Sequence, residues 1–593
     1  MISESQGVRL ARALSAAVLL SVFSAAASFA APPVGTGAAI ERNLPAPPPS
    51  NPTEIVPPSA PLASDDSTPL GPNLTAIVIL GPKDDLKTAV SRAVDTNDVA
   101  RLDNDQARAL LAPFIGRPIS KKLVGEIAAQ IVLYYRALGF PFVSVTTPPQ
   151  EITRGIVQFR VVEFRLDDAR VKGNTRTPAY FILERLRVHT NEPIDANLLA
   201  QDLDELNRYP FRTIQVSLSP STEFGKTNLD LAVTDLDPWH VYGGFANSGS
   251  QSTGWERFNL GGSIGSLLTT DSLLSYQFTS STDFWFANGN PFGDAGHPNY
   301  LSHALTFDAP TLPRQAVDLT LDMIETNAIS QKFFEIGSRI YEASLGYRLA
   351  LSDYIDAPGD LRVGLDAKRE ERSTYFGTTN VANAAIEIYQ LSAGWTDSWG
   401  DAWGRSSLDT SFHFSPGGLT GANGDHAFRL FSNNAERSAQ YVYGTATFAH
   451  YVGLPYDLGL ATELLAQVAS TRLPDTEQLG LGGMSNVRGY TLDDGAYDDA
   501  IIMRNELRAP AIGVLAQEGW ANDVLSPFAF IDLGTGSALG AHHVSNAGSV
   551  GLGADYSLGG IVSAGIDGAY AFEDAPFTKS GALRVEARLT ISN

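Results

Sequence analysis

The sequence predicts a mainly β protein in which a C-terminal transmembrane β-barrel of about sixteen antiparallel strands follows two small α/β domains. Three observations lead to this prediction. The 593 residues are 44% hydrophobic and 18% charged, yet no apolar run beyond the N-terminus could span a bilayer as a helix. Strand-like segments with alternating side chains continue to the end of the chain. One order of elements, strand, helices, strand, strand, occurs twice ahead of them.

The N-terminus predicts export from the cytoplasm. Arg9 and Arg12 precede an apolar run over residues 13–23, and Ser28-Phe29-Ala30 offers small residues before a cleavage site. This pattern is typical of a secretory signal peptide, which we place at residues 1–30. The alternative, a transmembrane anchor, needs a longer apolar run. Export followed by insertion through strands alone indicates the lipid bilayer of a bacterial outer membrane.

Residues 31–72 are predicted to form a proline-rich linker, as in the run Pro45-Ala46-Pro47-Pro48-Pro49. Such a composition favours an extended, semi-rigid tether. Within it, residues 38–43 could form about one or two helical turns.

The first α/β domain is predicted over residues 73–163. An apolar strand at 76–80 is followed by a helix that Ser120 caps and Gly139 ends, and by strands at 142–146 and 157–161. The residues that recur at helical spacing are Leu123, Ile127, Ile131 and Leu138.

The second α/β domain is predicted over residues 164–236 with the same order of elements. A strand at 166–172 leads to helices near 178–186 and 195–209. Two strands close the domain, with Ile214, Val216 and Leu218 on the first and Leu229, Leu231 and Val233 on the second.

Residues 237–593 would hold roughly sixteen transmembrane strands with their turns and loops. The final strand shows the pattern best, because Leu583, Val585, Ala587, Leu589 and Ile591 alternate with Arg584, Glu586, Arg588 and Thr590. Aliphatic side chains would face lipid and charged ones the lumen. The chain ends on Ile591-Ser592-Asn593, without the aromatic residue that usually ends such barrels.

One loop of the barrel region combines several glycines with a single arginine. Gly480, Gly482, Gly483 and Gly489 allow the chain around Arg488 to fold back tightly. Residues 501–507 then form a predicted strand.

A second segment offers a carboxylate to this arginine. In a strand, Phe528, Phe530, Asp532 and Gly534 would share one face, and Ala529, Ile531 and Leu533 the other. One wholly apolar face and one mixed face suit a wall between lipid and a wet lumen.

Together these segments resemble the outer-membrane transporters of two-partner secretion, the TpsB family. The resemblance lies in Leu473-Pro474, Glu477-Gln478, the Gly482-Gly483 pair, Val487-Arg488-Gly489-Tyr490 and the strand Arg504-Asn505-Glu506-Leu507-Arg508. In that family the loop enters the barrel from outside and its arginine meets an aspartate of the wall. The resemblance implies a loop–barrel lock made of Val487, Arg488, Gly489, Tyr490, Phe530, Asp532 and Gly534. It also implies that the α/β domains are two POTRA domains, and that residues 38–43 leave room for only a short plug helix.

The function that the resemblance implies is export of an unfolded partner exoprotein, such as an adhesin or haemolysin, to the cell surface. The POTRA domains would bind the partner, by adding its strand to an exposed sheet edge. The transporter itself is expected to be a monomer. The alternatives are a factor that inserts other proteins into the outer membrane, which usually has more POTRA domains, and a passive porin or adhesin, which would need none.

The residues give no sign of an enzyme, a cofactor or a metal site. A phosphate-binding loop ending in Lys-Ser or Lys-Thr is absent, as is a nucleophile elbow. His542 and His543 would point to opposite faces of a strand. Asp493, Asp494, Asp498 and Asp499 lack the ordered spacing of a calcium loop and are expected to be solvated. A formal net charge of -23 argues against nucleic acid, and the count of Cys 0 excludes disulfides and thiolate metal sites.

Overall fold

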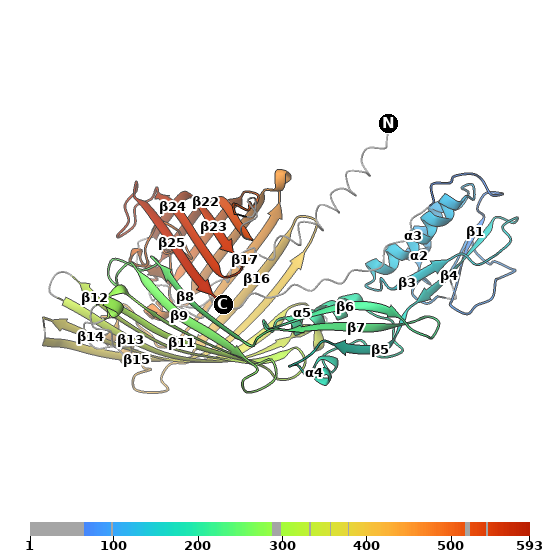
Figure 1. Cartoon of the computed structure of the whole chain (residues 1–593). Coiled ribbons are helices and arrows are strands. Elements are labelled where there is room, and N and C mark those ends of the chain that lie inside the picture. The colour runs from blue at the N-terminus through green and yellow to red at the C-terminus, as the bar shows by residue number, and fades with distance from the viewer. Residues whose placement is uncertain are drawn as a thin grey trace. The chain divides into compact units, whose positions relative to one another are not determined.

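The computed structural model describes residues 64–593 except 97–98, 287–297, 331–333, 356, 378, 516–521 and 541–543. The predicted signal peptide, residues 38–43 and most of the proline-rich linker lie outside the described residues, as do His542 and His543. The chain divides into two compact units, which we describe separately. Pro49–Asp237 contains the α/β domains, and Pro238–Asn593 contains the barrel (Figure 1).

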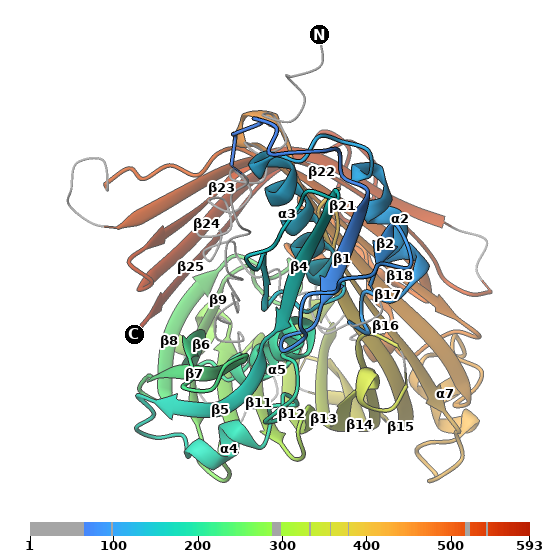
Figure 2. The same ribbon diagram turned by 90° about the vertical axis from the view of Figure 1, so that its right-hand side faces the viewer.

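The first α/β domain is a four-stranded sheet with helices packed on it. Its elements are β1 (Ala76–Leu80), β2 (Val94–Asp95), α2 (Asp105–Leu111), η2 (Ala112–Phe114), α3 (Lys121–Ala137), β3 (Val143–Thr146) and β4 (Ile156–Glu163), with strand order β2-β1-β4-β3. The Ser120 side chain accepts a hydrogen bond from the Leu123 N–H and so caps α3. Figure 2 shows α3 and the strands β1 and β4. The sequence patterns did not reveal β2 and α2, which are short.

The second α/β domain repeats this plan with three strands. Its elements are β5 (Arg165–Lys172), α4 (Ala179–Leu183), α5 (Ala196–Asn207), β6 (Arg212–Pro220) and β7 (Lys226–Asp235), with strand order β5-β7-β6. Asp195 caps α5 through the N–H groups of Asn197 and Leu198. Leu199, Leu203 and Ile214 are among the buried aliphatic residues of its core.

Across the described residues, every helix is too short or too polar to cross a membrane.

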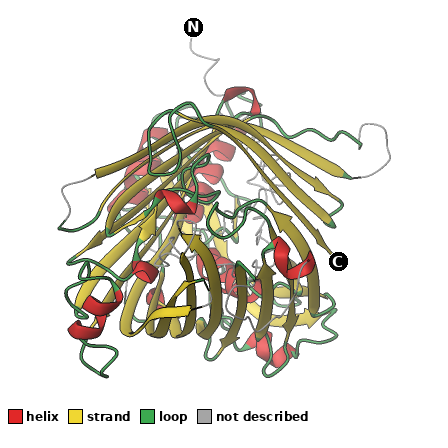
Figure 3. Ribbon diagram, turned by 90° about the vertical axis from the view of Figure 1, so that its left-hand side faces the viewer, coloured by secondary structure: helices red, strands yellow, loops and turns green. Residues whose placement is uncertain are grey.

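The predicted barrel is confirmed: sixteen antiparallel strands form a closed ring. The strands are β8 (Trp239–Ala246), β9 (Arg257–Gly265), β10 (Leu273–Ser280), β11 (Tyr300–Pro310), β12 (Gln315–Ser330), β13 (Phe334–Ala350), β14 (Asp360–Phe376), β15 (Thr379–Gly400), β16 (Arg405–Ser415), β17 (Tyr441–Gly453), β18 (Gly459–Ala469), β21 (Asp499–Arg508), β22 (Asp523–Ser537), β23 (Val544–Leu558), β24 (Val562–Ala571) and β25 (Leu583–Ser592). Each barrel strand pairs with the next barrel strand along the chain, and β25 pairs with β8 to close the ring. Figure 3 shows these strands in yellow.

Short helices occupy several connections of the barrel. They are α6 (Thr282–Phe286), η3 (Leu351–Asp353), α7 (Asp425–Phe431), η4 (Pro455–Asp457), η5 (Asp475–Glu477) and η6 (Leu492–Asp494).

The barrel buries polar groups and exposes aliphatic ones, as the alternation predicts. On β25, Leu583 is 80% exposed and Val585 58%, whereas Glu586 between Val585 and Ala587 is 0% exposed. On β22, Ile531 and Leu533 are exposed while Asp532 is buried. This arrangement is stable in lipid, because in water it would expose a continuous apolar surface to solvent.

Candidate functional site: a loop docked on the inner barrel wall

The connection between β18 and β21, residues 470–498, folds back onto the inner barrel wall. β8 starts directly after the second α/β domain, at one end of the barrel. Adjacent strands are antiparallel and β18 runs in the direction of β8, so this connection leaves the barrel at the opposite end. A short ladder of β19 (Leu479–Gly480) and β20 (Ala496–Tyr497) joins the two legs of the loop.

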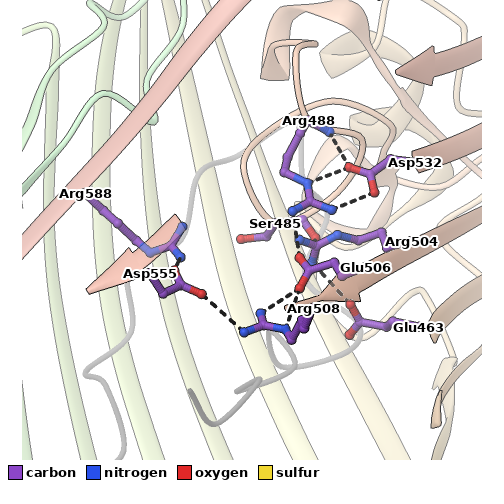
Figure 4. A network of polar contacts seen from close by, with 9 residues as sticks. All are labelled: Glu463, Ser485, Arg488, Arg504, Glu506, Arg508, Asp532, Asp555 and Arg588. Carbon is purple, nitrogen blue, oxygen red and sulfur yellow. Dashed lines mark hydrogen bonds and ion pairs between the residues drawn. The ribbon is translucent and has the colours of Figure 1, made fainter. Parts of the chain in front are cut away.

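The tip of the loop is held by Arg488, which lies between two carboxylates of the wall (Figure 4). Its Nε and one terminal nitrogen donate to the two carboxylate oxygens of Asp532 at 2.7 and 2.8 Å. Its other terminal nitrogen donates to Glu506 Oε1 at 2.7 Å. We name these interactions the tip contact. The Arg488 and Asp532 side chains are 3% and 0% exposed, so the pair is sheltered from solvent.

The aromatic ring of Phe530 packs against the guanidinium group of Arg488. The guanidinium carbon of Arg488 lies 3.7 Å from the centroid of the Phe530 ring, close enough for a cation–π interaction. A planar guanidinium can stack on a ring and pair with a carboxylate fork at once, which an ammonium group cannot do.

Glycines permit the close approach of the loop to the wall. Gly489 has a φ of +85°, and a Cβ atom there would lie 2.8 Å from the Ala569 Cβ. At Gly534 a Cβ would lie 2.9 Å from Val487 Cγ2, so this glycine leaves space for the valine. The Tyr490 hydroxyl lies 3.0 and 2.8 Å from the carbonyl oxygens of Gly548 and Glu573, to one of which it donates, and it accepts from the N–H groups of the same two residues at 3.1 and 3.2 Å.

Further charged residues continue the tip contact along the inner wall, and the sequence analysis did not identify them as site residues. Arg508 binds Glu506 at 2.6 Å and Asp555 at 3.4 Å, and Arg588 of β25 also donates to Asp555 (Figure 4). The sequence contains a pattern that could have identified the residues of β21. Arg504, Glu506 and Arg508 occur at every second position of this strand and so share one face.

The expectation that the acidic residues of the loop are solvated is wrong for Asp494 and Asp498. Asp494 is 1% exposed and accepts hydrogen bonds from Thr578, through its N–H at 2.7 Å and its hydroxyl at 2.6 Å. Asp498 is 0% exposed and accepts from the Leu473 N–H at 2.8 Å. Both carboxylates therefore stabilise the folded loop. Within the described part of the chain, acidic and histidine side chains form no cluster suited to a metal ion.

These features define a class of protein. A closed barrel that presents aliphatic side chains to lipid spans a membrane, and a loop docked inside it through a buried ion pair narrows its lumen. With two α/β domains ahead of the barrel, the chain has the architecture of a membrane-spanning β-barrel protein of the bacterial outer membrane.

Comparison with known proteins identifies the family within this class. A model of the haemolysin secretion/activation protein family ShlB/FhaC/HecB matches residues 225–556, and a model of the ShlB-type POTRA domain matches residues 90–163. The chain belongs to this family. It is a transporter of the bacterial outer membrane that secretes a partner exoprotein.

Individual relatives agree with this assignment. The heme/hemopexin transporter protein HuxB of Haemophilus influenzae is 22% identical over 417 residues, which cover 68% of this chain and 69% of the relative. The outer membrane transporter CdiB of Dickeya dadantii is 22% identical over 435 residues, covering 70% and 71%. The solved structure of CdiB from Escherichia coli shares the fold, with a TM-score of 0.66 at 18% identity and full coverage of both chains. Both of these relatives, HuxB and CdiB, are named as transporters.

Proposed function

We propose that this chain binds its partner exoprotein in the periplasm through two POTRA domains and that the tip contact holds the loop in the lumen until the partner passes. The arrangement of Arg488 between Asp532 and Glu506 carries this proposal. Residues 1–30 would direct export, residues 31–72 would be the linker, and residues 237–593 would be the barrel.

The assignment of two POTRA domains, at 73–163 and 164–236, rests on their common order of elements. The matched family model covers most of the first domain. The second has the same succession of strand, helices and two strands, without a counterpart of the short strand β2. In the described sheet, β6 is an edge strand whose only strand partner is β7, so its outer backbone groups could pair with a strand of the partner.

One chain is sufficient for the pore, because β25 and β8 close the barrel within it. We therefore propose a monomer without enzymatic activity. The loop supports secretion over a passive porin, since an open porin has no need of a sheltered loop contact. The two α/β domains support secretion over an assembly factor, which usually has more POTRA domains.

A double-mutant cycle tests the tip contact. Removing one partner of a sheltered ion pair costs about 3 to 5 kcal/mol, against about 0.2 to 1 kcal/mol for an exposed pair. We expect Arg488→Ala and Asp532→Ala each to reduce secretion of the partner strongly, and the double variant to be little worse than either. Independent, multiplying losses would contradict the proposal.

Arg362→Ala is the matched control for this cycle. Arg362 is an arginine of β14 that pairs with Asp318 of the barrel and not with the loop. It should leave secretion near the parental level. The heat-dependent gel shift of the folded barrel in detergent should be unchanged in every variant, which separates a loss of transport from a loss of insertion.

Deletion of residues 73–163 tests the role of the first POTRA domain. The barrel should still insert and resist heat, because its hydrogen bonds and lipid-facing surface lie in the other unit. Secretion should stop. Parental secretion after this deletion would contradict the receptor role.

A further inference from the structure

The loop has a second buried attachment, at its base. Glu477 lies in η5 with its side chain 0% exposed. Its Oε1 accepts from Lys368 Nζ at 2.7 Å and from the Thr476 hydroxyl at 2.9 Å. Its Oε2 accepts from the Tyr443 hydroxyl at 2.7 Å and from Gln390 Nε2 at 3.0 Å. These bonds occupy all of the roughly four acceptor positions of a carboxylate. We name the interaction of Glu477 with Lys368, Gln390 and Tyr443 the base contact.

The base contact lies on a different stretch of the wall from the tip contact. Its donors come from β14, β15 and β17, whereas Glu506 and Asp532 of the tip contact belong to β21 and β22. In the strand order around the barrel, β18 separates the two groups. Ion pairs therefore attach the loop to two separate stretches of the wall.

The two legs of the loop are also joined to each other near Glu477. Asp498, at the end of the second leg, accepts from the Leu473 N–H at 2.8 Å and from Arg472 at 3.2 Å. Gln478 Nε2 of the first leg donates to Asp498 Oδ1 at 3.3 Å. Because all these groups belong to the base, opening the base contact would break many buried bonds together.

One of the two wall carboxylates of the tip contact has a second arginine beside it. Glu506 already binds Arg508 at 2.6 Å, so it keeps a cation when Arg488 leaves. Lys368, by contrast, is 4% exposed and has Glu477 and Glu342 as its carboxylate partners at 2.7 and 3.3 Å. Release of Glu477 would weaken the pairing of a buried cation, which is costly.

We propose that Glu477 and Lys368 are positioning residues that keep the base of the loop fixed while the tip contact opens and closes. The movement is then confined to the segment beyond Glu477. This inference rests on the proposed role of the tip contact in secretion. A tether of roughly ten residues keeps Arg488 at a high effective concentration near Asp532, and a loop of that length closes in about 10 to 100 ns. The base contact thus ensures that the tip returns to its own site.

A labelling experiment tests this role on the full chain in outer membranes. The protein has no natural cysteine, so Val487→Cys introduces a single thiol at a position that is 0% exposed while the tip is docked. The rate of its reaction with a membrane-impermeant maleimide reports opening of the tip. We expect Glu477→Gln to raise this rate roughly tenfold, the factor that corresponds to loss of one charged hydrogen bond.

Glu342→Gln is the matched control, because Glu342 touches Lys368 from β13 and does not belong to the loop. It should change the labelling rate little. Lys368→Met combined with Glu477→Gln should be no worse than Glu477→Gln alone, since both act on one contact. An unchanged rate in Glu477→Gln, with the folded barrel verified by its gel shift, would overturn the proposal.

Cross-linking separates this proposal from the role of the tip. In Lys368→Cys/Glu477→Cys, a short thiol-reactive cross-linker should leave opening and closing of the channel intact in planar bilayers in potassium chloride. The same reagent on Arg488→Cys/Asp532→Cys should abolish those transitions. If the base cross-link also abolishes them, the whole loop moves and our inference is wrong. If the tip cross-link changes nothing, the proposed role of the tip contact fails instead.

Discussion

The two units of this chain bury opposite kinds of side chain. The α/β unit has an aliphatic interior, in which Ile77 and Leu203 are both 0% exposed. The barrel has a polar interior, in which Asp532 and Glu586 are 0% exposed, while its aliphatic side chains point outward. The first unit is stabilised by removing apolar surface from water, and the second by lipid outside and paired charges inside.

Two buried arginines show what this difference means for function. Arg212 of the α/β unit, 0% exposed, donates to the Leu206 carbonyl in the last turn of α5 and lies over the Tyr209 ring. It therefore stabilises a helix end. Arg488 of the barrel unit joins a loop to two carboxylates of other strands. Burial of a cation alone therefore does not indicate a functional site.

The largest effect is expected for a charge placed in the aliphatic core. Leu203→Asp should unfold the second α/β domain, at a cost above about 4 kcal/mol, because no partner exists there for a buried carboxylate. Limited proteolysis of the full chain should cut this domain rapidly. The heat-resistant gel mobility of the barrel should persist; its loss would contradict the independence of the two units.

A smaller cost is expected for a charge on the outer face of the barrel. Leu365 on β14 is 55% exposed and faces outward. Leu365→Arg should destabilise the barrel in lipid vesicles by up to about 2 to 4 kcal/mol, the range for an arginine near the bilayer midplane. Denaturant unfolding measures this, with Leu365→Phe as an apolar control. Equal stability of the two variants would place Leu365 outside the lipid-facing band.

The next effect distinguishes the two buried arginines. Arg488→Lys keeps the charge and loses the two-pronged geometry, so it should weaken the tip contact by about 1.5 to 3 kcal/mol. Secretion and labelling of Val487→Cys are the measurements. Arg212→Lys should leave secretion and the labelling rate unchanged, since an ammonium group can still donate to the Leu206 carbonyl at the end of α5. Full activity of Arg488→Lys would show that charge alone is sufficient.

The smallest effect concerns the pH dependence of the second α/β domain. Burial raises the pKa of Asp235, but hydrogen bonds from the N–H groups of Arg176, Thr175 and Thr177 outweigh burial and hold this pKa below its usual value. The ionised Asp235 carboxylate therefore stabilises the folded domain. This stabilisation is present above the unfolded pKa of about 3.9 and is lost as the pH falls through the folded pKa.

Asp235→Asn should therefore reduce stability at neutral pH by less than about 1 kcal/mol, since the group is partly exposed. The difference from the parent should vanish at low pH. Thermal unfolding followed at several pH values would measure this. If the difference in stability between Asp235→Asn and the parent were the same at every pH, the effect would come from the geometry of the hydrogen bonds and not from the charge of Asp235.

Local patterns allowed much of the fold to be predicted. Helical spacing after Ser120 predicted α3, and alternation predicted the faces of β22 and β25, because both depend on residues close together in the chain. The short elements β2 and α2 escaped prediction, since two to seven residues carry too little periodicity. The predicted domain boundaries, like the functional role of the loop–barrel lock, stay predictions.

The sequence by itself determined the class of fold and the loop with its arginine, because alternation and glycine content are properties of neighbouring residues. The family resemblance also paired Arg488 with Asp532, whereas only the tertiary structure decided which other distant groups meet. The pairs Glu477–Lys368 and Arg508–Asp555, and the burial of Asp498, depend on how the closed ring curves and on where the loop crosses it. A charged residue on an inward face has several possible partners across a lumen, and the path of the chain through space selects one.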